Sequence, residues 1–173
     1  LPRYKQPVED TVVDASNVLA VTLANGAANG DRLDSQKIHR LFNAEKHIKK
    51  IQIYDKTKTE QEFVIYVTDA YGRVLYHSQD PTAVGADFRR WNDIYRTLKG
   101  DYGARSTRLD PKDPFSTTMY VAAPIFISNH LAGVISVGKP ISSFHGFIMS
   151  AKWRLYSSVL LIIASSLIVL FLL

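Results

Sequence analysis

Two side chains in the middle of the chain, Trp91 and Arg105, have the chemistry to recognise a ligand. The indole of Trp91 can form a flat apolar wall, and the Arg105 guanidinium is a planar fork that pairs with a carboxylate or a phosphate. Both also have a structural alternative. A large aromatic side chain is usually a buried core residue, and Arg105 could instead form a surface ion pair with Asp93 or Asp101. The weaker candidates, each with a hydroxyl group, are Tyr66, Tyr120 and Ser136.

The sequence contains no pattern that predicts catalysis or metal binding. Its five histidines show no two-histidine helical spacing and no acidic neighbour at ligand spacing. The absence of cysteine excludes a disulfide framework, thiolate zinc sites and cysteine nucleophiles. There is no nucleophile elbow, no phosphate-binding loop and no dinucleotide-binding glycine motif. We therefore expect no catalytic residue, metal or cofactor in this segment.

The net charge of +5 does not predict a nucleic-acid surface. The densest basic run, EKHIKK at residues 45–50, contains an acidic residue and is expected at a helix end. A nucleic-acid face would be a broader basic patch with interleaved aromatic side chains. We therefore expect no nucleic-acid partner, and part of the charge could lie near anionic lipid headgroups.

Segments with the composition of strands must carry most of the candidate ligand residues. Residues 63–68 are β-branched and aromatic, and 73–77 return after a turn, which predicts a β-hairpin. A helix predicted at residues 88–99 carries Trp91 and ends at Gly100, a favourable residue after a helix. The other predicted strands are residues 102–108, 118–125 and 131–137, with a short additional strand at 51–54.

Alternation along these strands predicts a sheet with two different faces, because successive side chains point to opposite sides. We expect the apolar face to pack in the core and the mixed face to border a ligand pocket. In the first long strand the apolar face carries Phe63, Ile65 and Val67. The mixed face carries Val64, Tyr66, Thr68, Thr118, Tyr120, Ala122, Val134, Ser136 and Gly138.

Helices are predicted before and within the run of strands. Residues 8–23 repeat apolar side chains at spacings of three and four, and Asp34 is placed to cap a second helix. This order predicts an α+β architecture, a five-stranded antiparallel sheet with the N-terminal helix on one face and the 88–99 helix on the opposite, pocket face. The predicted buried stripes are Ile38, Leu41 and Phe42 in the second helix, and Phe88, Trp91, Tyr95 and Leu98 in the later one.

The last residues of the chain, 155–173, include no charged side chain and predict a transmembrane helix. At about 1.5 Å per residue this run nearly spans a hydrocarbon core of about 30 Å. The helical pattern from residue 141 onward predicts an exit helix that continues into it. Lys152 and Arg154 would place the preceding domain in the cytoplasm under the positive-inside tendency, a small bias that a C-terminal flank could outweigh.

The predicted organisation has four parts, and we expect the chain to be a fragment of a longer membrane protein. The parts are an N-terminal helix at 1–30 that leads from a first transmembrane segment, a sheet domain at 31–140, the exit helix at 141–154, and the transmembrane helix at 155–173.

Several sequence blocks resemble a known family. They are RWND at 90–93, TLKGDYGARST at 97–107, MYVAAPI at 119–125, GVISVGKP at 133–140 and YVTDAYGRVL at 66–75. Together these blocks are similar to the periplasmic sensor region of the Cre-type histidine kinases, the carbon-source and β-lactam-response sensors of Gram-negative bacteria. The layout also resembles the single-Cache, PAS-like sensor domains.

The resemblance implies a periplasmic sensor domain of a dimeric receptor in the bacterial inner membrane. A cytoplasmic kinase that uses ATP and magnesium would lie outside this segment and phosphorylate a cognate response regulator. It also implies a small ligand of unidentified nature, bound on one sheet face under the middle helix. Two alternatives stay open: the sensor of a chemoreceptor or cyclic-dinucleotide enzyme, and a protein-partner or dimerisation module without a small ligand. A polar cavity near Arg105 would favour ligand sensing, and a filled, apolar sheet face would favour the protein-partner module.

Overall fold

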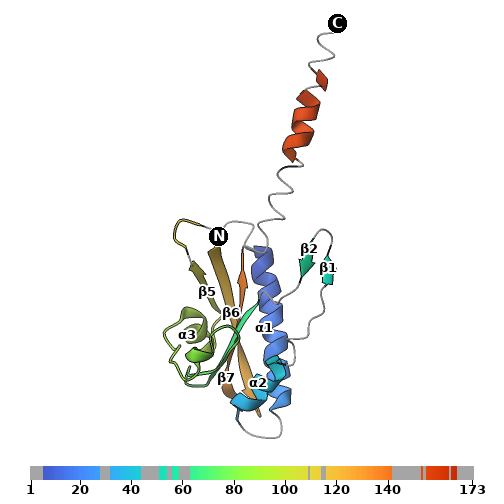
Figure 1. Ribbon diagram of the computed structural model, residues 1–173. Helices are drawn as coiled ribbons and strands as arrows, with labels where there is room; N and C mark the ends of the chain where they lie inside the picture. Colours follow the sequence, from blue (N-terminus) through green and yellow to red (C-terminus); the bar gives the residue numbers. More distant parts are fainter. Residues whose placement is uncertain are drawn as a thin grey trace.

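The fold is built on a five-stranded antiparallel sheet with the strand order β4-β3-β7-β6-β5 (Figure 1). The computed structural model describes residues 6–27, 32–43, 51–53, 56–58, 63–108, 110–113, 116–141, 153, 155–163 and 165–166. The strands of the main sheet are β3 (Val64–Asp69), β4 (Val74–His77), β5 (Gly103–Arg108), β6 (Thr117–Ile127) and β7 (His130–Pro140). The helices are α1 (Gln6–Gly26), α2 (Ser35–Asn43), the short 3-10 helix η2 (Pro81–Ala83) and α3 (Asn92–Leu98). The predicted α+β fold with its five strands is confirmed.

The two faces of the sheet bury two separate hydrophobic clusters, as the alternation predicts. On one face Ile65, Val67 and Val137 pack with α1 and α2. On the other face Tyr66, Val134 and Ala122 pack with Phe88 and Ile94 from the segment around α3. The N-terminal helix and α3 therefore cover opposite faces, and Figure 1 shows α1 lying along the sheet.

Helix α1 forms the main cover of the first face because its apolar side chains recur on one side. Val8, Val12 and Leu23 are buried against β6 and β7, whereas Val18 and Val21 on the outer side are 65% and 61% exposed. Helix α2 begins as expected, since the Asp34 carboxylate accepts a hydrogen bond of 2.8 Å from the Gln36 amide. Its buried side chains include Ile38 and Phe42, but the prediction for Leu41 is wrong, because Leu41 is 45% exposed.

Helix α3 is shorter than predicted. It begins at Asn92 instead of residue 88, because the Phe88 amide bonds to the Gly72 carbonyl of the β3–β4 turn at 2.9 Å. That bond, with the bridge between Asp87 and Arg73, holds residues 87 and 88 against the hairpin and keeps them out of the helix. Trp91 is consequently the N-cap residue. Tyr95 is 48% exposed and does not belong to the buried stripe, whereas Ile94 is fully buried.

Some predicted elements lie partly or wholly outside the described residues. Residues 142–152 of the predicted exit helix are outside them, whereas 155–163 and 165–166 of the predicted membrane helix are helical. Among the described residues no helix has the length and apolar character needed to cross a membrane. The short strand predicted at 51–54 is found as β1 (Ile51–Ile53), which pairs with β2 (Lys56–Lys58) in a separate two-stranded sheet.

Candidate functional site

The predicted ligand residues meet around one buried carboxylate, Asp93, which is 0% exposed. Tyr66 on β3 and Ser136 on β7 both donate hydrogen bonds from their hydroxyls to Asp93 Oδ2, the Ser136 bond measuring 2.8 Å. Arg105 on β5 donates from Nε to Asp93 Oδ1 at 3.0 Å and completes a buried ion pair. Three strands and the first turn of α3 therefore contribute to a single hydrogen-bonded cluster, which we call the Asp93 cluster.

The sequence around α3 explains how Asp93 reaches this position. The neighbouring Asn92 donates from Nδ2 to the Ala104 carbonyl at 2.7 Å, which aligns the first turn of α3 with the start of β5. Glycine at position 103 allows the close approach, because a Cβ there would lie 2.1 Å from the Asp93 carbonyl oxygen. The helix ends at Leu98, and Gly100, the residue after the C-cap Lys99, has a φ of 84° that suits the reversal of the chain into β5.

The Arg105 guanidinium lies between two aromatic rings. Its central carbon is 4.1 Å from the ring centroid of Trp91 and 4.1 Å from that of Tyr120, a cation–π arrangement on both sides. The guanidinium also donates to the Tyr66 hydroxyl at 3.3 Å and to Thr107. The Arg105 side chain is 18% exposed, so the group is held in the sheet surface with one edge toward solvent.

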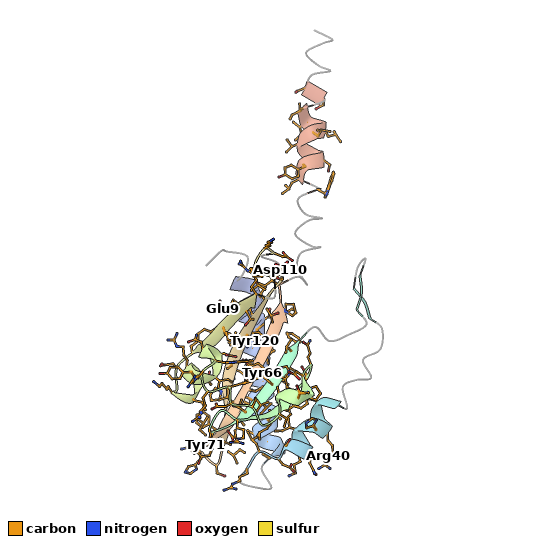
Figure 2. The ribbon with its side chains drawn as sticks, turned by 60° about the vertical axis from the view of Figure 1, so that its left-hand side comes forward. Glu9, Arg40, Tyr66, Tyr71, Asp110 and Tyr120 are labelled. Atoms are coloured by element: carbon orange, nitrogen blue, oxygen red, sulfur yellow. The ribbon has the colours of Figure 1, made fainter. Side chains whose placement is uncertain are left out.

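The two aromatic walls are themselves fixed by packing. Trp91 stacks on Phe88 with ring centroids 3.6 Å apart and meets the Tyr66 ring edge-on at 5.7 Å. Tyr120 faces Gly138 across the β6–β7 pair, where a Cβ would lie 2.4 Å from its ring. Trp91 is thus both a core residue and a wall beside Arg105. Figure 2 shows Tyr66 and Tyr120 over the middle of the sheet.

Both tyrosines in the Asp93 cluster stay protonated near neutral pH. Burial, and next the Asp93 carboxylate, raise the pKa of Tyr66 well above its ordinary value of 10.0. Burial also raises the pKa of Tyr120. Tyr66 is therefore available only as a hydroxyl donor to Asp93 at neutral pH, and no proton has to move for the cluster to form.

The buried carboxylate of the Asp93 cluster accepts hydrogen bonds from three donors. A guanidinium has five N–H donors, and Arg105 directs donors to Asp93, Tyr66 and Thr107, so N–H groups remain on its outer edge. Trp91 and Tyr120 form a layer of aromatic rings at this guanidinium. The volume beneath that layer is filled by Tyr66 and Asp93, which are both 0% exposed.

Sequence reasoning identifies every member of the cluster except its centre. Trp91, Arg105, Tyr120, Tyr66 and Ser136 are brought together by the structure, whereas the sequence suggests Asp93 only as an alternative partner of Arg105. The sequence signal that could have identified Asp93 is the RWND block. In the structure its Asn92 and Asp93 bind successive residues of β5, Ala104 and Arg105. The described residues contain no group of three or more His, Cys, Asp or Glu side chains placed to hold a metal ion.

Comparison with known proteins gives one close sequence relative. No protein-family model matches the chain. The sensor protein CreC of Escherichia coli (strain K12) is 39% identical over 163 residues, which are 93% of this chain and 34% of that protein. The chain thus spans about a third of the length of this relative.

A comparison of folds also finds a sensor domain among the similar structures. The crystal structure of the sensor domain of DcuS from E. coli superimposes with a TM-score of 0.51 and 20% sequence identity, covering 80% of this chain and 96% of that domain. At this identity the likeness shows the fold alone. The chain is therefore a homologue of the sensor protein CreC, over a segment equal to about a third of that protein, and its sheet has the PAS-like fold of single-Cache sensor domains.

Proposed function

We propose that this chain is the extracytoplasmic sensing domain of a membrane-anchored sensor histidine kinase. The observation that carries the proposal is its 39% identity to the sensor protein CreC across 93% of the chain. The phosphorylation chemistry, with its ATP and magnesium, belongs to a cytoplasmic part of the parent protein, which phosphorylates a cognate response regulator. This segment supplies recognition, and the position of the Arg105 guanidinium beside Trp91 and Tyr120 supports that role.

The proposed ligand is a small polar or anionic molecule bound at the outer edge of Arg105. The guanidinium is held flat between Trp91 and Tyr120, so its remaining N–H groups are oriented before a ligand arrives. Because Asp93 already neutralises Arg105, the site favours one carboxylate, one phosphate or several hydroxyl groups over a highly charged molecule. The ligand contacts Trp91, Arg105 and Tyr120, and Tyr66 and Ser136 support them from below.

In the proposed receptor, residues 155–173 cross the inner membrane and the sheet domain lies in the periplasm. The described turns at 155–163 agree with this assignment, because large apolar side chains there are exposed, Leu160 by 72% and Leu161 by 70%. Two copies of the receptor pair along α1, whose outer side exposes Val18 and Val21. Ligand binding then shifts how α1 and the exit helix lie against the sheet.

Thermal unfolding of the chain with a panel of small molecules tests the ligand site. We expect acetate, inorganic phosphate or glucose to raise the Tm, and Arg105→Lys to abolish that rise, because lysine keeps the charge opposite Asp93 but loses the fork. Arg89→Lys is the matched control, since Arg89 pairs with the exposed Asp87 outside the site. A rise in Tm that survives Arg105→Lys would contradict the site.

A second candidate function is recognition of a periplasmic protein. The observation in its favour is the filled sheet face, since Tyr66 and Asp93 occupy the volume beneath Arg105. Thermal unfolding with the same small molecules distinguishes the small-ligand function from the protein-partner function. If no small molecule changes the Tm and a periplasmic protein binds with a dependence on Trp91, the protein-partner function holds and the small-ligand function fails.

A further inference from the structure

A cleft of about 540 Å³ lies at the edge of the sheet, away from the Asp93 cluster. It is bounded by α1 on one side, the end of α3 and the turn after it on the other, and β6 at its base. Figure 1 shows α3 beside β5 and α1 running along the sheet. A volume in this range is typical of small-molecule sites, which occupy about 300–1,000 Å³.

The cleft exists because two neighbouring strands differ in length. β5 begins at Gly103, which pairs with Ala122, but β6 continues to Ile127. In the part of the chain that the structure describes, residues 123–127 of β6 therefore have no strand beside them on that side. The turn from α3 to β5, with Gly100 at a φ of 84°, passes beside this free edge without covering it.

The base of the cleft is apolar and its rim is polar. Val121, Pro124 and Leu131 contribute to the base, and Asn17 and Asp101 stand at the two sides. Such a lining suits a ligand with an apolar body and one polar group, because the body removes apolar surface from water while the polar group stays at the rim.

In the described part of the chain, two carboxylates, Asp101 and Glu9, and one cation, Lys99, lie at the cleft, so their summed formal charge is negative. Among the described residues, the Asp101 carboxylate has no hydrogen bond or ion pair. Lys99 also lines the cleft, and its ammonium donates to the Tyr95 hydroxyl at 2.5 Å and lies 4.3 Å from the Tyr95 ring centroid. At the α1 side, Tyr102 donates to Glu9 at 2.7 Å, which places a second carboxylate beside the cleft. A cationic group is therefore the complement of this rim.

An added strand is a poor occupant for the same edge. Pro124 has no N–H to donate, and proline on an edge strand is one of the ways in which proteins block strand pairing. A small molecule needs no continuous ladder of backbone hydrogen bonds, so the proline does not exclude it.

We propose that the edge cleft is a second binding site, for a small organic cation with a compact apolar body, such as a cycloalkyl ammonium. Its apolar body lies on Pro124 and Leu131 and its ammonium faces Asp101. The preferred charge is opposite to that of the Arg105 site, so the two sites take different ligands. An occupant touches both α1 and the turn after α3. It therefore connects the helix that packs on one sheet face with the segment that packs on the other.

Amide chemical shifts of the 15N-labelled 173-residue chain in detergent micelles test this site. The probes are cyclohexylammonium, cyclohexanol and cyclohexanecarboxylate, which share one body and differ in charge. We expect cyclohexylammonium to shift the amides of Asp101, Tyr102 and Leu131 and to bind about tenfold more tightly than the carboxylate. Asp101→Asn should remove most of that preference.

Two tryptophan variants on α1 form a matched pair. Asn17→Trp fills the cleft and should abolish the shifts, whereas Asn25→Trp, also at an exposed position of α1 but outside the cleft, should leave them unchanged. Equal affinity for the three probes, or shifts that survive Asn17→Trp, would overturn the proposal. Shifts confined to residues 155–166 would also overturn it, because the probe would then lie in the micelle. If an extended pentapeptide shifts the amides of Ala123 and of residues 125–127 and cyclohexylammonium does not, the edge docks a strand and the proposal falls.

Discussion

At the scale of single residues, Asp93 is a fully buried carboxylate whose partner Arg105 has a side chain that is 18% exposed. A fully buried carboxylate is stable only with its partners in place, and removal of one partner of a buried pair typically costs about 3–5 kcal/mol. Replacement of both partners by apolar residues of similar volume is often close to neutral. The pair can therefore be separated experimentally into its contribution to folding and its contribution to recognition.

We predict that Arg105→Met lowers the free energy of unfolding by about 3–5 kcal/mol, because Asp93 is left buried without its cation. The double variant with Asp93→Leu should regain part of that loss, because the unpaired buried charge is gone but the Tyr66 and Ser136 hydroxyls lose their acceptor. Urea unfolding followed by circular dichroism measures both. Arg89→Met is the control, since its pair with Asp87 is exposed and its loss should leave the midpoint unchanged. A double variant as unstable as the single one would show that the pair contributes more than mutual neutralisation.

His77 predicts a pH dependence of stability. Burial lowers the pKa of His77 below its ordinary value of 6.5, while Asp80 acts in the opposite direction. Its Nδ1 accepts a hydrogen bond of 2.9 Å from the Asp80 amide, which requires the unprotonated nitrogen. The unfolded chain therefore binds this proton at a higher pH than the folded one, so stability is present above pH 6.5 and is lost as the pH falls through that value toward the folded pKa.

The variant His77→Asn keeps a side-chain acceptor for the Asp80 amide but does not titrate. We expect the fall in Tm between about pH 7.5 and 5.5 to be smaller in the variant than in the original chain. Parallel curves for the two proteins would exclude His77 as the titrating group.

The residues of the site could be predicted to a large extent, and the reason is the period of a strand. Tyr66, Tyr120 and Ser136 fall on one face of the sheet in any antiparallel register that keeps the apolar residues together. Asp93 could not be placed in the same way, because its position depends on where α3 begins. An aspartate early in a helix is ordinarily solvent-exposed, and only the approach of β5 under α3 buries it.

At the scale of elements, the packing of α3 on β5 determines the geometry of the site. Gly100 and Gly103 both serve this packing, but for different physical reasons. Gly100 adopts a φ of 84° and has open space where a Cβ would lie, whereas Gly103 has no room for a Cβ. Backbone strain and steric exclusion can thus be compared within one short segment.

We predict that Gly100→Ala costs about 1–2 kcal/mol of stability, the usual penalty of a left-handed backbone for a residue with a Cβ. Gly103→Ala should cost more, because its methyl group would lie 2.1 Å from the Asp93 carbonyl oxygen and force α3 away from β5. Thermal unfolding of both variants gives the comparison. Equal losses would show that α3 moves without resistance.

The strands could be predicted from the sequence because β-branched and aromatic runs bounded by turns are local signals. The start of α3 could not, since the residues before it have an acceptable helical pattern. Their backbone instead bonds to the turn of a distant hairpin, from the Phe88 amide to Gly72, and no local pattern reports that contact. The prediction for Tyr95 is wrong for the same reason, because the helix starts later and a different side is buried.

At the scale of the whole molecule, the two faces of the sheet are covered by different elements. The Asp93 cluster lies under α3, and α1 covers the opposite face. The Tyr102 hydroxyl, in the turn after α3, donates a hydrogen bond of 2.7 Å to Glu9 of α1 and so links the two segments around the edge of the sheet. A shift of α3 thus has a direct route to α1 in addition to the route through the sheet.

The proposed location predicts which side of the membrane the domain occupies. The chain has no cysteine. A single cysteine introduced at the exposed position of Asp110 in the parent protein can therefore be labelled by a maleimide without reaction at any other residue of this segment. We expect a membrane-impermeant maleimide to label Asp110→Cys in cells whose outer membrane has been permeabilised and whose inner membrane is intact. Labelling only after lysis of the inner membrane would place the domain in the cytoplasm.

The proposal that the Asp93 cluster controls a kinase is tested most directly by the autophosphorylation rate of the full-length parent receptor in membrane vesicles. Arg105→Lys should change that rate by about fivefold or more, because coupling between sites is commonly worth about 1–3 kcal/mol. Arg89→Lys, with its exposed partner Asp87, should leave the rate unchanged. An unchanged rate for Arg105→Lys, in a receptor that is folded and inserted like the original, would contradict the proposed role of this domain in signalling.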